Sequence, residues 1–205
     1  ALSWRFSVGQ SGSGVLGDLV SHAVDLVGHV VSPIVELVAD AAWELAQKRI
    51  GAIIALQGKD NLADHVRSGI GWQGLVSREM LVSIFWDKNP VHDGAAIIAG
   101  DRVTTVGAVL PLSGRSDLPS YFGTRHRAAA GLAEQADALV VAVSEERGEI
   151  SVARGETIER RLTRQRLAEL IEDHLTQLDA YRQPRPGRSR ELSFAAAAAL
   201  LTVAV

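Results

Sequence analysis

Short apolar runs alternate with longer stretches of helical periodicity along the middle of this chain, and this alternation constrains the fold more than any other feature. The strand-like runs cover residues 50–56, 95–99, 103–110, 138–143 and 149–153. The stretches with helical spacing cover residues 78–86, 124–134 and a last segment that opens at Thr163. Runs this short are typical of buried strands. Strands interleaved with helices predict an α/β fold, with a mixed and mostly central β-sheet flanked by helices.

Composition limits both the architecture and the range of functions. With 205 residues, of which 47% are hydrophobic and 22% charged, the chain is long enough for one domain with a real core plus appendages. The formal net charge of −3 gives no overall positive field, so we expect no nucleic-acid partner. The absence of cysteine excludes disulfides and thiolate metal sites, and it is compatible with a cytoplasmic protein.

The two ends of the sequence differ from its middle. The predicted segments are a flexible N-terminal segment over 1–14, a helical segment over 15–47, the main domain over 48–180, a basic linker over 181–193 and a hydrophobic tail over 194–205. Pro33 is expected to divide the helical segment into two helices. The wide apolar face of that segment could pack on the domain, on another copy or near a membrane surface.

The hydrophobic tail is uncharged from Phe194 to Val205, which is shorter than the roughly 20 apolar residues of a membrane span. Arginines precede it, and positive charge next to a span favours the cytoplasmic side. Two interpretations remain open. The tail could be a truncated membrane anchor, or it could be an apolar segment that packs on the domain or on a partner.

The run Val91-His92-Asp93-Gly94-Ala95 is the first of three blocks that could carry chemistry. Gly94 and Ala95 add almost no side chain, so a ligand could approach the backbone closely. The Asp93 carboxylate could hold a metal ion or prepare a hydroxyl group. His92 adds a nitrogen, although Mg²⁺ prefers oxygen ligands. The alternative is a turn whose aspartate caps local amides.

The second block, Gly123-Thr124-Arg125-His126-Arg127, opens a predicted helix. Backbone amides at a helix N-terminus bind phosphate readily, and Thr124 could add a hydroxyl. Arg125 and Arg127 could each donate forked, charge-assisted bonds to phosphoryl oxygens, and His126 could donate another. The alternative is a solvated basic first turn. Because cations there oppose the helix dipole unless an anion lies in front of them, the block favours phosphate binding.

The third block, Ser144-Glu145-Glu146, follows the predicted strand at 138–143. Ligands of α/β proteins bind at strand ends, but consecutive side chains alternate in direction, so we expect at most one of the two carboxylates to enter a site. The alternative is a polar hairpin tip closed by Gly148. Leu110, at the end of another predicted strand, could form the floor of a base pocket or belong to the core.

Taken in order, these blocks resemble those of the diadenylate cyclase (DAC) domain, and the likeness is nearest to the membrane-anchored bacterial enzymes. The resemblance covers about residues 40–178. It rests on the runs Lys48-Arg49-Ile50-Gly51-Ala52, His92-Asp93-Gly94-Ala95, Leu110-Pro111-Leu112-Ser113, Gly123-Thr124-Arg125-His126-Arg127-Ala128-Ala129 and Ser144-Glu145-Glu146. Several motifs in one order make the resemblance specific, whereas Asp-Gly-Ala alone would be weak.

The resemblance implies an activity. Such enzymes condense two ATP molecules into cyclic di-AMP and release two pyrophosphates. Two domains meet face to face, each holding one ATP, and each 3′-hydroxyl attacks the α-phosphorus of the opposite ATP. The resemblance therefore implies ATP as substrate, Mg²⁺ or Mn²⁺ as cofactor, and a homodimer or higher homo-oligomer for catalysis.

The resemblance also implies roles for single residues. Asp93 would assist metal-aided deprotonation of the attacking hydroxyl, and His92 and Glu146 would help to hold the metal. Catalytic roles are implied for Asp93, Arg125, His126 and Arg127. Nucleotide-binding roles are implied for Gly94, Ala95, Leu110, Thr124, Arg125, Arg127, Ser144 and Glu145.

Two features depart from the family pattern. Val109 stands where the membrane-anchored relatives often carry an aromatic residue before Leu-Pro-Leu, so adenine would stack elsewhere, for instance on Tyr121. Those relatives also carry their membrane spans before the domain, whereas here the hydrophobic run is C-terminal. We expect a cytoplasmic catalytic domain, with anchoring to the cytoplasmic face of the membrane through 194–205 as the open question.

Two alternatives to an active cyclase remain. The first is a catalytically weak module that binds adenine nucleotides as a sensor. The second is an interaction protein in which the helices of 15–47 and the C-terminal run build an oligomer and the arginine block is merely solvated.

Overall fold

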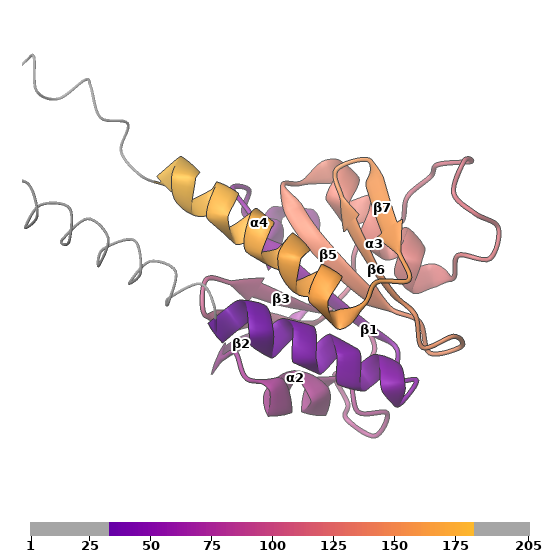
Figure 1. Cartoon of the computed structure of the whole chain (residues 1–205), viewed down its shortest axis with the longest axis horizontal. Coiled ribbons are helices and arrows are strands. Elements are labelled where there is room, and N and C mark those ends of the chain that lie inside the picture. The colour runs from indigo at the N-terminus through magenta and orange to yellow at the C-terminus, as the bar shows by residue number, and fades with distance from the viewer. Residues whose placement is uncertain (1–32, 183–205) are drawn as a thin grey trace, which may run out of the picture.

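The computed structural model describes residues 33–182, which form a seven-stranded mixed sheet with helices on both faces (Figure 1). In chain order the elements are a helix over residues 33–47, β1 (Ala52–Gln57), the 3₁₀ helix η1 (Leu62–His65), β2 (Ile70–Leu75), α2 (Arg78–Ile84), β3 (Ala95–Ala99), β4 (Arg102–Ala108), α3 (Thr124–Gln135), β5 (Ala138–Val143), β6 (Ile150–Arg154), β7 (Thr157–Arg160) and α4 (Arg164–Arg182). The strand order is β2-β4-β3-β1-β5-β6-β7. Only β1 and β3 pair in parallel, so the predicted mixed α/β fold is confirmed.

Strand β1 lies at the centre of the sheet and contributes to a core on each face. Its residues alternate in direction, as in any strand. Ile54 and Leu56 join the core on one face, whereas Ile53 and Ala55 join the core on the other. The apolar run that predicted this strand is therefore apolar throughout because helices cover both faces.

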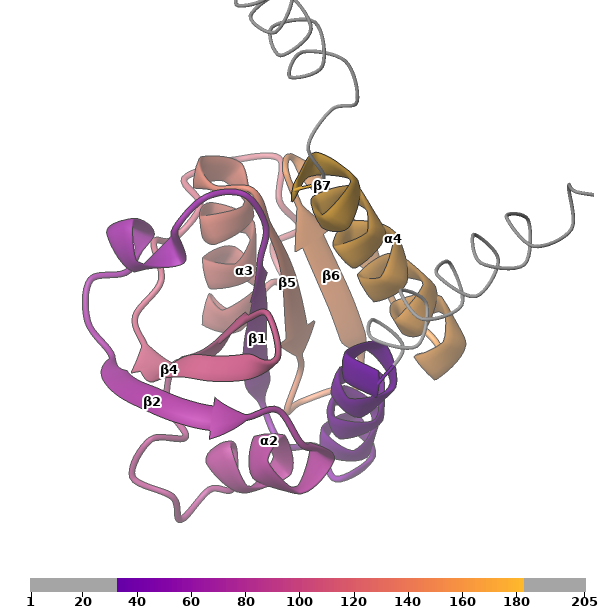
Figure 2. The same ribbon diagram turned by 90° about the vertical axis from the view of Figure 1, so that its left-hand side faces the viewer.

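The helices are divided unequally between the two faces of the sheet. The helix over 33–47, α2 and α4 cover one face, and α3 covers the other (Figure 2). Val38, Ala42 and Leu45 of the first helix are fully buried in the shared core. The apolar face of 15–47 was expected to pack on the domain, on another copy or near a membrane surface. The described part of this face packs on the domain. Arg164 pairs with Glu36 and Asp40, which joins α4 to this helix.

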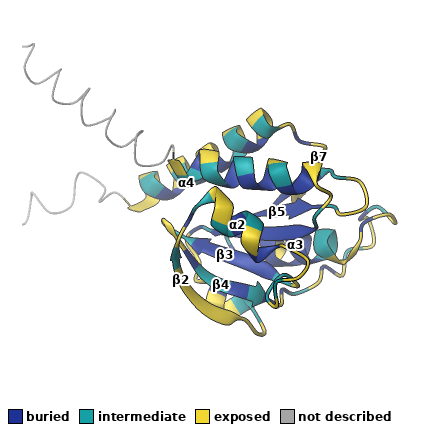
Figure 3. Ribbon diagram, turned by 90° about the horizontal axis from the view of Figure 1, so that it is seen from below, coloured by how far each residue is buried: buried dark blue, intermediate teal, exposed yellow. Residues whose placement is uncertain are grey.

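Two strands were not predicted from the sequence. β2 is exposed along most of its length, whereas β1, β3 and β5 are buried (Figure 3). β7 is short and alternates between exposed and half-buried residues. Both strands lie at the edges of the sheet. Helices do not cover both of their faces, so these strands need no continuous apolar run.

The predicted segments 1–14 and 194–205 lie outside the described residues, as do residues 15–32 of the predicted helical segment 15–47 and residues 183–193 of the predicted linker 181–193. The helix α4 continues to Arg182, two residues beyond the predicted end of the domain. Within residues 33–182, no helix combines the length and the apolar character needed to cross a membrane.

The register of the central strands brings two of the three predicted blocks to one edge of the sheet, together with the segment just before β1. Ile53 of β1 lies opposite Ala95 of β3, and Ala52 lies opposite Val143 at the end of β5. The segments just before β1, just before β3 and just after β5 therefore meet at this edge. They contain Gly51, Asp93 and Ser144 respectively.

Candidate nucleotide site

Arg125 occupies the meeting point of the three segments. Its Nη1 lies 2.9 Å from Oε2 of Glu145, in the segment after β5. The guanidinium also lies directly against Gly51, where an added Cβ would come within 2.6 Å of Nη1. Sequence reasoning gave Gly51 no role, although a glycine just before a buried strand is a signal of close approach. The guanidinium is therefore held in place from two sides.

Three hollows surround Arg125, which lines all of them. The Asp93 hollow, of about 420 Å³, is lined by residues that include Asp93, Gly94, Leu110, Leu112, Thr124 and Ala128. The Ser144 hollow, of about 280 Å³, is lined by residues that include Tyr121, His126, Ser144, Glu146, Arg147 and Arg160. The Arg49 hollow, of about 500 Å³, is lined by residues that include Lys48, Arg49, Trp86, His92 and Glu145.

The N-terminus of α3 lies between the Asp93 hollow and the Ser144 hollow. Its N-cap is Gly123, which supplies no side-chain hydrogen bond, and its first turn contains no acidic residue. Thr124 and Arg125 line both hollows. Uncapped amides and cations at the positive end of a helix dipole form a site that an anion would stabilise.

The protonation state of His126 differs from the charged state that would suit a phosphate ligand. Its ring stacks on Phe122, with centroids 4.6 Å apart. Burial lowers the pKa of His126, and the positive charge of Arg147 lowers it further. The ring is therefore neutral at pH 7 in the chain alone, and it can donate one hydrogen bond to a phosphate but brings no charge.

The turn before β3 exposes Asp93 by bringing two glycines together. Gly94 has a φ of +127°, and a Cβ there would lie 2.6 Å from the carbonyl carbon of Gly107. Only glycine satisfies both conditions. The Asp93 side chain accepts no hydrogen bond from the described residues, so the alternative of a capping aspartate is not what the structure contains.

The neighbouring His92 has its tautomer fixed by the same turn. Its Nδ1 lies 2.7 Å from the carbonyl oxygen of Asn89, and since that oxygen can only accept, Nδ1 carries the proton. Nε2 is therefore the acceptor nitrogen, the arrangement usual for a histidine that binds a metal.

The Ser144 block forms the tip of a hairpin, and it also lines the Ser144 hollow. Ser144 accepts a hydrogen bond at its Oγ from the amide of Arg147, and Gly148, with a φ of +65°, closes the tip. Both Glu145 and Glu146 line the Ser144 hollow, but only Glu145 also reaches the Arg49 hollow and pairs with Arg125.

Several predicted residues lie apart from this cluster. Arg127 lines none of the three hollows, since it lies about 200° around the helix from Arg125, and its carbonyl accepts a hydrogen bond from Ser113. Ala95 is fully buried in the core behind Gly94. Tyr121 lines the Ser144 hollow and contacts Arg147 and Arg160, so it lies away from the apolar floor of the Asp93 hollow.

Comparison with known proteins agrees with the order of these blocks. The sequence model of the family described as DAC, DisA bacterial checkpoint controller nucleotide-binding, matches residues 39–158. The chain belongs to the DAC family. The match covers every block around Arg125, and it begins inside the helix over 33–47 that packs on the sheet.

Individual curated relatives of this DAC chain have names that agree with one another. It is 37% identical over 138 residues to the cyclic di-AMP synthase CdaA of Bacillus subtilis, which covers 67% of this chain and 50% of that protein. It is 42% identical over 110 residues to the diadenylate cyclase of Mycoplasma pneumoniae, covering 53% of this chain and 54% of that one. The chain thus spans about half the length of the curated relatives it matches.

Solved structures share the DAC fold. A crystal structure of a double mutant of DacA from Staphylococcus aureus superposes with a TM-score of 0.67 at 36% identity, covering 70% of this chain and 95% of that one. A second structure, described as a hypothetical membrane spanning protein from Bacillus cereus, gives a TM-score of 0.60 at 31% identity and covers 62% of each chain.

The predicted metal ligands of the DAC domain lie on different hollows. Asp93 lines the Asp93 hollow, His92 the Arg49 hollow and Glu146 the Ser144 hollow. Across residues 33–182, no group of three histidine, cysteine or acidic side chains is placed to hold a metal ion. The donors are nevertheless of a suitable kind, because Mg²⁺ at nucleotide sites uses one or two carboxylates together with phosphate oxygens.

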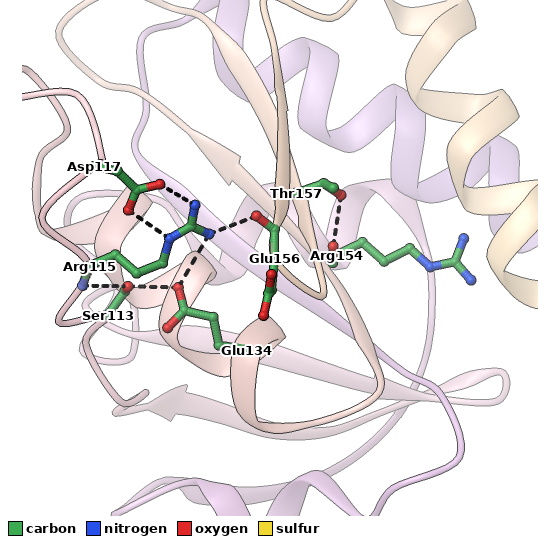
Figure 4. A network of polar contacts seen from close by, with 7 residues as sticks. All are labelled: Ser113, Arg115, Asp117, Glu134, Arg154, Glu156 and Thr157. Carbon is green, nitrogen blue, oxygen red and sulfur yellow. Dashed lines mark hydrogen bonds and ion pairs between the residues drawn. The ribbon is translucent and has the colours of Figure 1, made fainter.

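One loop of the DAC domain forms walls of two hollows and is held by Arg115. The loop joins β4 to α3, with Leu110 and Leu112 on the Asp93 hollow and residues 120–123 on the Ser144 hollow. The Arg115 guanidinium donates to Asp117 at 2.5 Å and to the carbonyl of Glu156 at 2.7 Å (Figure 4). Figure 4 also shows Ser113 donating to Glu134 of α3 at 2.7 Å. These contacts connect the loop to α3 and to the turn between β6 and β7.

Proposed function

We infer that this chain is a diadenylate cyclase, which joins two ATP molecules into cyclic di-AMP and releases two pyrophosphates. The observation that carries this inference is the uncapped, cationic N-terminus of α3, which opens beside an apolar floor and an exposed aspartate. The names of the relatives support the same activity.

The adenosine part of ATP suits the Asp93 hollow. Leu110 is buried at its floor, and Val109 and Leu112 are exposed at its rim, so apolar side chains offer contact to a base. Among residues 33–182 no aromatic side chain lines this hollow, so we expect adenine to bind by apolar contact rather than by stacking. The α-phosphate would then lie at Thr124 and Arg125, where amides, a hydroxyl and a guanidinium converge.

The reaction needs an oriented nucleophile and neutralised phosphoryl charge rather than covalent help from the protein. In each of two equivalent steps a 3′-oxygen forms a bond to an α-phosphorus, the bond from that phosphorus to pyrophosphate breaks, and the hydroxyl proton is released. Asp93 would orient this hydroxyl and accept its proton, because its carboxylate is exposed and free of hydrogen bonds within the described chain. Arg125 would stabilise the charge on the phosphoryl group.

A divalent cation fits this proposal as a shared ligand of protein and substrate. Asp93 would hold Mg²⁺ or Mn²⁺ together with phosphate oxygens, with His92 and Glu146 as further candidates. The bound ion would supply charge neutralisation and a lower pKa for the attacking hydroxyl.

Two copies of the chain are required by this chemistry. Each block around Arg125 occurs once in the sequence, so one chain holds one ATP, whereas the product contains two adenylates. We infer a face-to-face homodimer, or a higher homo-oligomer that contains such pairs.

We also infer a cytoplasmic catalytic domain associated with the membrane. Support comes from the membrane spanning protein of Bacillus cereus as a structural neighbour, and from the arginines followed by an uncharged run in this sequence. If this inference holds, the chain that includes residues 194–205 will bind lipid vesicles, and a chain that stays entirely in the supernatant after vesicle sedimentation would contradict it.

The activity is tested by incubating the purified chain with ATP and Mn²⁺ or Mg²⁺ and separating the nucleotides by chromatography. We expect cyclic di-AMP and pyrophosphate. A folded chain that forms no cyclic di-AMP at high concentration would refute the inference. If such a chain still bound ATP, a nucleotide sensor would be the better description, and if it did not, an interaction protein would be.

A further inference from the structure

The helix over 33–47 ends in a backbone conformation that its sequence does not favour. The amide of Arg49 donates to the carbonyl of Ala46 at 3.1 Å, and the amide of Ile50 donates to that of Leu45 at 2.9 Å. This is the bonding pattern of a Schellman motif, which places glycine at the left-handed position. Here Arg49 occupies that position, with a φ of +53°.

A left-handed arginine costs free energy that glycine would avoid. Strain of this kind clusters at functional sites, and Arg161 shows that it also occurs outside the hollow in this chain. Arg49 lines the Arg49 hollow, which Arg125 lines as well. No carboxylate within residues 33–182 pairs with its guanidinium, whereas neighbouring Lys48 is paired with Glu44 at 2.6 Å. The hollow thus contains a cation that nothing in the described chain neutralises.

The other charges of the hollow leave room for an anion. Lys48, Arg49 and Arg125 line it on the positive side, and Asp87 and Glu145 on the negative side. Glu145 is paired with Arg125. Trp86 is 46% exposed there and offers an indole face.

From an α-phosphate at Arg125, the β- and γ-phosphates of ATP could extend into the Ser144 hollow or into the Arg49 hollow. In the Ser144 hollow the cations Arg147 and Arg160 are both packed on Tyr121, and Glu145, Glu146 and Glu149 add negative charge. The Arg49 hollow is larger, at about 500 Å³ against about 280 Å³, and has fewer carboxylates. Charge and volume both favour the Arg49 hollow.

We propose that the Arg49 hollow is a diphosphate site, in which Arg49 binds the β- and γ-phosphates of ATP and then the pyrophosphate that leaves. This rests on the proposed function for the identity of the nucleotide, whereas the binding of pyrophosphate itself can be measured without turnover. The left-handed backbone of Arg49 places this cationic residue at the hollow.

The test is calorimetric titration of the full chain with pyrophosphate, with a nonhydrolysable ATP analogue and with AMP. Arg49→Gly removes the charge and relieves the backbone, and Arg49→Asn removes the charge but retains a residue that tolerates the left-handed region. We expect both variants to bind pyrophosphate and the ATP analogue about tenfold more weakly or worse, as for the loss of a charge-assisted bond. AMP affinity should stay within twofold of wild type, and Arg49→Gly should melt at the same temperature or higher.

Arg161→Gly is the matched control. Arg161 also has a left-handed backbone, with a φ of +55°, and it pairs with Glu149 rather than lining the Arg49 hollow. Its loss should leave pyrophosphate affinity within twofold of wild type. The proposal is overturned if the wild-type chain does not bind pyrophosphate, if Arg49→Gly binds it as wild type does, if AMP weakens as much as the ATP analogue, or if Arg161→Gly gives the same loss.

These outcomes separate the proposal from the proposed function. A chain that makes cyclic di-AMP but binds pyrophosphate independently of Arg49 retains the activity and refutes the site. A chain that makes no cyclic di-AMP but binds pyrophosphate through Arg49 retains the site and refutes the activity.

Discussion

Asp93 combines an exposed carboxylate with a backbone that only glycine at position 94 permits. If it accepts the proton of the attacking hydroxyl, Asp93→Asn will abolish turnover, because the amide cannot act as a base. ATP affinity should change by no more than about threefold, since in the proposed site Arg125 and the amides of α3 would carry the phosphate contacts. Product chromatography and calorimetric titration of the same variant check both statements. Loss of binding together with turnover would show that Asp93 is structural.

His174 of α4 is a residue whose burial makes stability depend on pH. It is 2% exposed, and neither ring nitrogen has a hydrogen-bond partner in the described chain. Burial lowers the pKa of His174, and the positive charge of Arg154 lowers it further. Below about pH 6.5 the unfolded chain therefore binds a proton that the folded chain resists, so stability falls as the pH falls.

His174→Leu removes the contribution of His174 to the pH dependence of stability and leaves an apolar side chain in its place. We expect the variant to equal or exceed wild type by about 1 kcal/mol at pH 7.5, because an unsatisfied buried polar group is lost. Between pH 7.5 and pH 5.5 the variant should lose less stability than wild type, although His126 keeps part of the dependence. Urea denaturation at both pH values measures this. Equal losses in the two proteins would contradict the assignment.

At the scale of elements, α3 is positioned by its contact with the loop that follows β4. A Cβ at Gly131 would lie 2.6 Å from the amide nitrogen of Ser113, so the loop rests directly on the helix backbone. The same loop carries Leu110 and Leu112 to the Asp93 hollow. The geometry of the site therefore depends on this close approach.

Gly131→Ala tests that dependence. Overpacking against the loop backbone, less the gain in helix propensity, should cost about 1–2 kcal/mol of unfolding free energy. ATP affinity should fall as well, because the wall of the hollow is displaced. Gly114→Ala, in the same loop but with no atom within 4 Å of the added Cβ, should stay within about 0.5 kcal/mol of wild type. Equal effects of the two substitutions would exclude a special role for the contact.

The elements that could be predicted from the sequence are those covered by helices on at least one face. The strands β1 and β5 are apolar because they are buried. Their ends were therefore predicted to within two residues of the observed ends. β2 carries Gly71 and Gly74 in an exposed strand, and β7 has one apolar residue. Neither contains the periodic apolar pattern on which a prediction depends.

The site was predicted in composition but not in arrangement. The blocks were recognised because their residue types suit phosphate chemistry. Which of the three hollows Asp93, His92 and Glu146 line depends on how β1, β3 and β5 align, and a local pattern does not contain that information. Gly51 was overlooked for the same reason, since its contact with Arg125 joins residues far apart in sequence.

In the complete enzyme that we propose, one chain supplies half of a reaction centre. Each chain would contribute one Asp93, one α3 N-terminus and one ATP, and the opposite copy would contribute the rest. A chain with Asp93→Asn should still bind ATP and still face a wild-type chain, yet the pair could complete only one of the two phosphodiester bonds. Such a chain should therefore act as an inhibitor of its wild-type copy.

The most direct measurement follows from this. A fixed, low concentration of wild-type chain is premixed with increasing amounts of folded Asp93→Asn chain, ATP is kept saturating, and the rate of cyclic di-AMP formation is recorded. If two chains share one reaction centre, the rate per wild-type chain will fall steadily as the variant comes into excess. A rate that stays constant at every ratio would contradict a shared reaction centre.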